Sequence, residues 1–186
     1  WKLSSGLVTG RLGSGALNIT GGGRVESSFG ILGRELFSTG TVNVDGPGSE
    51  WTNSGSLDIG GLGLGTLNIT GGGKVQSASS RVGLDDPGSG VVTVDGSGSE
   101  WIVSGELKLG VEGFGTLDIT AGGSVVSHTN AFIGSGPFSI STATVAGAAP
   151  NGAGSNWTIG GRLSIGGDAP AGLDGGTGTL KIQPGG

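Results

Sequence analysis

Residues 51–57 are Trp-Thr-Asn-Ser-Gly-Ser-Leu, and residues 101–107 are Trp-Ile-Val-Ser-Gly-Glu-Leu. A looser form of the same phrase returns at 157–163. The tryptophans of the series are Trp1, Trp51, Trp101 and Trp157. Successive members are 50, 50 and 56 residues apart. A long fixed period is typical of a protein in which one structural unit is stacked repeatedly along an axis.

A 25-residue period lies within the 50-residue one and is carried by three-residue phrases of the form apolar-polar-apolar. These phrases begin at Leu17, Val42, Leu67, Val92 and Leu117, each 25 residues after the one before. Two further copies, at 143–145 and 180–182, follow a one-residue shift and an insertion. Because successive side chains of a strand point to opposite faces, each phrase predicts a strand with one buried face. We expect the first residues of these phrases to form one interior column.

Each 25-residue unit contains three such apolar pieces, separated by Gly, Ser, Asn and Asp residues that favour tight corners. Helical spacing is absent, and Gly supplies 46 of the 186 residues, which disfavours helix. The sequence therefore predicts an all-β parallel β-helix (β-solenoid) with about 25 residues per turn and three short strands, of three to five residues, in each turn. Parallel crossovers favour a right-handed winding.

We expect a single array over residues 1–186, cut from a longer protein. Its units are 1–50, 51–100, 101–156 and a partial unit 157–186.

Composition excludes several classes of function. The net charge is −5 and no Lys/Arg cluster is present, which argues against a nucleic-acid partner. No run of 18 apolar residues exists, so we expect no membrane contact by this fragment. The absence of Cys excludes disulfides and thiol chemistry.

Residues 65–75 (Gly-Thr-Leu-Asn-Ile-Thr-Gly-Gly-Gly-Lys-Val) and 90–101 (Gly-Val-Val-Thr-Val-Asp-Gly-Ser-Gly-Ser-Glu-Trp) resemble a known repeat. It is the repeat shared by type V secretion (autotransporter) passengers and PEP-CTERM-type surface proteins. The likeness covers nearly the whole chain and weakens in the loops at 34–39, 84–89, 135–141 and 168–176. The resemblance implies an exported, rod-like, adhesin-like β-helix that is extracellular, on the bacterial outer cell surface. It supplies no catalytic residue.

The Trp series has two interpretations. In the first, Trp1, Trp51, Trp101 and Trp157 fill the core at one corner of every second turn. Val25, Val75 and Val125 take the same place in the turns between, and an apolar substitute favours burial. In the second, the rings form an exposed track for sugar rings.

A polar strip is predicted on the outer surface, because Asn68 must point outward if Leu67 and Ile69 point inward. The residues of this candidate self-association strip are Asn18, Asn43, Asn68, Thr93, Asp118, Thr20, Thr70 and Thr120. The strip is either a solvated face or a surface for homotypic docking. An ice-binding face is disfavoured, because Asn68 separates Thr66 from Thr70 and acidic residues interrupt the outer row.

The titratable residues do not form a recognisable catalytic or metal site. The recurring carboxylates are Asp45, Asp95, Glu50 and Glu100. Their recurrence at every second turn, about 10 Å apart, indicates a structural role more than a glycosidase pair. Residues 85–87 form one acidic loop with fewer oxygen ligands than Ca²⁺ requires. His128 stands alone, so no triad, metal site or cofactor is predicted.

We therefore expect a non-enzymatic structural or adhesive protein, a stalk or fibre element that self-associates in cell–cell contact or biofilm. The alternative is a polysaccharide-binding or polysaccharide-degrading β-helix, with surface glycans as partners. The insertions at 146–156 and 167–176 are candidate binding loops, or equally neutral extensions of a corner.

Overall fold

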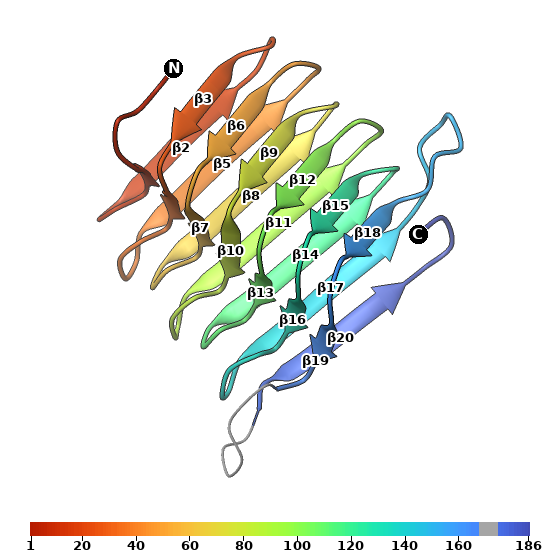
Figure 1. Ribbon diagram of the computed structural model, residues 1–186. Coiled ribbons are helices and arrows are strands. Elements are labelled where there is room, and N and C mark those ends of the chain that lie inside the picture. The colour runs from red at the N-terminus through yellow and green to blue at the C-terminus, as the bar shows by residue number, and fades with distance from the viewer. Residues whose placement is uncertain (168–174) are drawn as a thin grey trace.

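The computed structural model describes residues 1–167 and 175–186, which form 20 strands and no helix (Figure 1). The chain winds in about six turns of roughly 25 residues. All named strands pair in parallel, and they form three sheets that run the length of a rod. The predicted β-solenoid is confirmed.

The first sheet, here called the long-strand sheet, has seven strands of six or seven residues. They are β2 (Ser14–Ile19), β5 (Thr39–Asp45), β8 (Leu64–Thr70), β11 (Ser89–Asp95), β14 (Phe114–Thr120), β17 (Ile140–Ala146) and β20 (Thr177–Ile182). These strands exceed the predicted three to five residues, because the polar residues beside each apolar phrase continue its in–out alternation.

The other two sheets have strands of three or four residues. The Trp sheet consists of β3 (Arg24–Ser27), β6 (Glu50–Asn53), β9 (Lys74–Ser77), β12 (Glu100–Val103), β15 (Ser124–Ser127) and β18 (Asn156–Ile159). The short-strand sheet consists of β1 (Leu7–Thr9), β4 (Gly30–Leu32), β7 (Ser56–Ile59), β10 (Ser79–Val82), β13 (Leu107–Leu109), β16 (Ala131–Ile133) and β19 (Leu163–Ile165).

The predicted interior column of the long-strand sheet is confirmed. Its members pair in the order Leu17, Val42, Leu67, Val92, Leu117, Ala143 and Leu180. Those between the two terminal turns are fully buried, while Leu17 and Leu180 are partly buried against the core. Each turn therefore covers the apolar side chains of its neighbour, which lets a small core per turn remain stable.

The Trp column explains the 50-residue period. Its register is Val25, Trp51, Val75, Trp101, Val125 and Trp157. Adjacent turns are about 4.8 Å apart, so a valine between two indoles leaves each ring the space that it needs. Trp51 and Trp101 are fully buried and Trp157 packs partly buried against the core, which confirms the core interpretation for these three.

The prediction of a core position is wrong for Trp1, which is 68% exposed. Lys2 and Glu26 form a parallel β-bridge, and the Glu26 N–H donates to the Trp1 carbonyl oxygen at 2.8 Å. Trp1 therefore lies beside Val25 and begins the Trp column. It belongs to the first turn that the structure describes, and the outer side of its indole faces solvent there.

The insertion at 146–156 leaves the register of the core intact. An antiparallel bridge between Ala148 and Gly154 closes the loop, and the Asn151 side chain donates to Ser97 Oγ at 3.2 Å. Trp157 still pairs with Val125, so the extra residues are absorbed at one corner. Of the second insertion, residues 168–174 lie outside the described residues.

The residue that follows Thr20, Thr70 or Thr120 forms a corner, and its backbone is in the left-handed region. Gly21 and Gly71 have φ values of 60° and 58°, and Ala121 adopts 50° at the equivalent place. Non-glycine residues rarely adopt this region because Cβ approaches the following carbonyl oxygen. Ala121 is therefore a strained position in an otherwise regular array.

We predict that Ala121→Gly raises the free energy of unfolding by about 0.5–1 kcal/mol, because relief of the left-handed strain exceeds the entropy that glycine loses on folding. Urea unfolding followed by circular dichroism measures the change. Gly21→Ala is the matched control: its new Cβ would meet nothing within 4 Å, so only backbone strain should destabilise it. A lower unfolding midpoint for Ala121→Gly would contradict this explanation.

The buried indole N–H groups differ in their partners. Trp51 Nε1 donates to Ser27 Oγ at 3.1 Å, and Trp157 Nε1 donates to Ser127 Oγ at 3.2 Å. Trp101 Nε1 is buried without a partner, and Ser77, the serine equivalent to Ser27, hydrogen-bonds Ser80 at 2.7 Å.

We expect Trp101→Phe to destabilise the protein by about 1 kcal/mol less than Trp51→Phe, since only the second change breaks a hydrogen bond and the first removes an unsatisfied buried donor. The two substitutions remove the same volume from equivalent sites, so each is the control for the other. Equal losses in a denaturant titration would show that the Trp101 N–H carries no penalty.

Candidate interaction surface

The outer face of the long-strand sheet contains the predicted strip. Its middle column pairs in the order Asn18, Asn43, Asn68, Thr93, Asp118, Thr144 and Lys181. A second column, here called the acidic margin, contains Asp45, Thr70, Asp95 and Thr120. Thr20 follows Ile19, the partner of Val44, and so begins this margin. All these residues alternate with buried ones and lie outward.

Side-chain hydrogen bonds join the middle column from turn to turn. Asn43 Nδ2 donates to Asn18 Oδ1 at 2.6 Å, and Asn68 Nδ2 donates to Asn43 Oδ1 at 2.8 Å. Such amide ladders stabilise stacked parallel strands whose equivalent residues lie in register. The ladder holds these asparagine side chains in one orientation, so this part of the face has a fixed shape.

The acidic margin is linked in the same way. Thr70 Oγ1 donates to Asp45 Oδ1 at 2.6 Å, and Thr120 Oγ1 donates to Asp95 Oδ1 at 2.6 Å. The recurring aspartates therefore accept hydroxyl groups from the next turn, in agreement with their predicted structural role. The 25-residue register places each threonine directly beside its aspartate.

A third outward column was missed from the sequence. It consists of Ala16, Thr41, Thr66, Val91, Thr116, Thr142 and Thr179. The signal was present, because a threonine stands two residues before the polar centre of most apolar phrases. With this column, the outer face is built mainly from short threonine and asparagine side chains.

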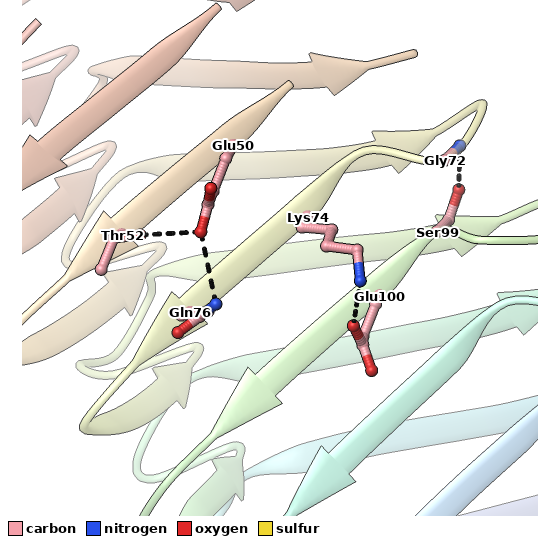
Figure 2. Close-up of polar contacts among 7 residues, drawn as sticks. All are labelled: Glu50, Thr52, Gly72, Lys74, Gln76, Ser99 and Glu100. Atoms are coloured by element: carbon pink, nitrogen blue, oxygen red, sulfur yellow. Dashed lines mark hydrogen bonds and ion pairs between the residues drawn. The ribbon is translucent and has the colours of Figure 1, made fainter. Parts of the chain in front are cut away.

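The outer face of the Trp sheet has a different character (Figure 2). Lys74 Nζ lies 2.8 Å from Glu100 Oε2, and Gln76 Nε2 donates to Glu50 Oε1 at 3.3 Å. Further along, the Lys2 ammonium hydrogen-bonds Glu26 and lowers the pKa of that exposed carboxyl. Long charged side chains that pair across turns remain hydrated, which is typical of a solvated surface.

The short-strand sheet holds one partly buried ion pair on its outer face. Arg81 binds Asp58 with two hydrogen bonds of 2.7 and 2.8 Å, and Asp58 is only 5% exposed. Donating these hydrogen bonds to Asp58 raises the pKa of the Arg81 guanidinium. Because Arg81 occupies both carboxylate oxygens, Asp58 is committed to structure and is unsuited to acid–base chemistry.

Two hollows lie at the corner that precedes the long strands. Phe37, Thr39, Leu62 and Leu64 contribute to an apolar hollow of about 260 Å³. A second hollow, of about 390 Å³, is lined by Asp86, Glu112, Pro137 and Phe138.

Asp86 and His128 are the remaining titratable candidates from the sequence. Asp86, from the acidic loop at 85–87, shares its hollow with one other carboxylate, Glu112. Across residues 1–167 and 175–186, no three His, Cys, Asp or Glu side chains gather where a metal ion could bind. His128 is exposed just after β15.

No protein-family model, curated protein or solved structure matches this chain. Among the residues that the structure describes, no helix is long and apolar enough to cross a membrane. The three outer faces of the rod are therefore the candidate functional surfaces.

Proposed function

We propose that this chain is a rod-like structural element of an exported cell-surface protein, which self-associates through the outer face of its long-strand sheet in cell–cell contact or biofilm. The observation that carries the proposal is the unbroken register of that face across seven strands. The resemblance of residues 65–75 and 90–101 to repeats of exported surface proteins supports the location.

The size of the face supports a protein partner. Seven strands spaced about 4.8 Å apart, each about 23 Å long, give an area of about 780 Å². A standard stable interface buries about 800 Å² on each partner. One long-strand face is therefore large enough for one specific contact with a second copy.

Side-chain length distinguishes this face from the other two. Threonine and asparagine lose little conformational entropy when a partner approaches, whereas ordering long Lys, Arg and Glu side chains costs more. The Trp sheet presents Arg24, Glu50, Lys74 and Glu100 outward, and the short-strand sheet presents Arg81 and Lys108. The long-strand face permits the closest approach of another molecule.

We predict concentration-dependent association of the purified chain in sedimentation velocity, and its loss in Thr93→Lys, which places a long cation at the centre of the face. Thr158→Lys makes the same change on the outer face of the Trp sheet and should leave association unchanged. A wild-type chain that stays monomeric at high concentration would contradict self-association and leave a passive spacer.

A polysaccharide-binding role is the second candidate, favoured by the hollow that combines the Phe138 ring with the carboxylates of Asp86 and Glu112. An aromatic face beside hydrogen-bond acceptors can hold a sugar ring. Phe138 is 86% exposed and has a φ of 63°, so asparagine is a suitable replacement because it tolerates the left-handed region.

Under this alternative, the chain is retained on immobilised chitosan or cellulose, and Phe138→Asn abolishes retention. Phe37→Asn is the matched control, because Phe37 has a φ of 61° but lines the apolar hollow, which has no carboxylate. Equal retention of both variants and the wild type would dismiss the Phe138 hollow as a sugar site.

A further inference from the structure

We propose that two copies pair through their long-strand faces with the rods antiparallel, so that equivalent margins of the two faces meet. This inference rests on the proposed self-association and adds the orientation, the register and the side chains that carry the contact.

One margin of the long-strand face carries three large, exposed apolar side chains among serines and threonines. Leu64, Phe114 and Ile140 are the first residues of β8, β14 and β17 and lie in one outward column. They are 54%, 41% and 56% exposed. Large exposed apolar side chains that line up along a surface mark an interaction site. This column is here called the apolar margin.

The apolar margin also contains a hollow that fits a ring. The hollow of about 260 Å³ is bordered by Thr39 and Leu64 of this column and by Phe37, which is 97% exposed. A partner that inserts an aromatic side chain here would bury both surfaces, as interface anchors do.

The two margins differ, and this difference selects the orientation. A two-fold axis parallel to the rods would place the apolar margin of one copy against the acidic margin of the other. Asp45 and Asp95 would then lose water against apolar groups, which is unfavourable. A two-fold axis along the strands makes the rods antiparallel and places the apolar margin of one copy along the apolar margin of the other.

Charge and the position of the hollow together select the register. An axis through β11 would face Asp95 with the partner's Asp95. An axis between β8 and β11 instead sets Thr70 opposite the partner's Asp95. It also sets Asn43 opposite the partner's Asp118, and no carboxylate of the strip faces another. In the same register, the partner's Phe114 reaches the level of Thr39, at the hollow.

The chain has no cysteine, so single introduced thiols report the pairing directly. We choose Asn18, Thr93 and Thr144, which share the middle column at increasing distance along the rod. In the proposed pair, Thr93 lies one strand spacing, about 5 Å, from its copy, whereas Asn18 and Thr144 each lie about 24 Å from theirs along the axis.

With a bismaleimide that spans less than about 24 Å, Thr93→Cys should cross-link to the same residue of the second copy. Asn18→Cys and Thr144→Cys should not cross-link alone, but a mixture of the two should. Thr158→Cys, on the outer face of the Trp sheet, is the control for random collision. Self-linking of both Asn18→Cys and Thr144→Cys would show parallel pairing and overturn the proposed orientation. Self-linking of only one of them would overturn the proposed register.

A second variant tests the apolar contact without a cross-linker. Phe114→Ser should weaken dimerisation by about tenfold or more, as loss of an interface anchor does. Phe29→Ser is the control, because Phe29 is similarly exposed, at 37%, and lies outside the long-strand sheet. Equal effects of the two would overturn the role of the apolar margin.

Self-association and the antiparallel orientation can be disproved separately. Dimers with a parallel cross-linking pattern would remove the antiparallel orientation and leave self-association standing. A monomer in sedimentation, with no cross-links above the Thr158→Cys control, would overturn both.

Discussion

The structure depends on one constraint, the parallel register that places each residue on its counterpart about 25 residues away. Each interior column is a stack of side chains that must fit one another at a fixed spacing of about 4.8 Å. In the Trp column, this requirement produces the alternation of tryptophan and valine. On the outside, it produces ladders in which Asn43 and Thr70 bond to residues of adjacent turns.

The same register gives the rod three faces of different chemistry. A residue that recurs every 25 residues forms a column of equivalent side chains along one face. The three strands of a turn differ in their outward residues, so the three faces differ in chemistry. On the outer face of the Trp sheet, Arg24 pairs with Glu50 and Lys74 pairs with Glu100 in adjacent turns, so opposite charges alternate along it. The threonines and asparagines of the long-strand sheet give a face of short side chains with fixed positions. This contrast is the reason for assigning association to the long-strand face.

Much of the fold could be predicted from the sequence, because the fold repeats and each apolar phrase confirms the others. The Leu17 to Leu117 column and the alternation of Trp51 with Val75 follow from spacing alone. Trp1 could not be placed correctly, since its burial depends on a covering turn and not on its own phrase. The unpaired N–H of Trp101 could not be predicted either, because Trp51 stands at the equivalent place in its phrase and does have a partner.

The candidate surface was only partly predictable. The outward position of Asn68 follows from strand alternation, and its ladder partners follow from the period. The apolar margin was missed, because Leu64 and Phe114 stand outside the recurring phrases and vary with Ser89 and Thr39 in the same column. That Leu64 and Phe114 belong to one outward column is known only once the strand ends and their register are known.

The central claim, that the long-strand face is the contact surface, is tested most directly by hydroxyl-radical footprinting below and above the concentration at which the chain associates. The structure predicts that Leu64, Phe114 and Ile140 become protected while Phe29 and Trp1 stay reactive. Protection of Phe29 or Trp1, with unchanged reactivity along the long-strand face, would contradict it.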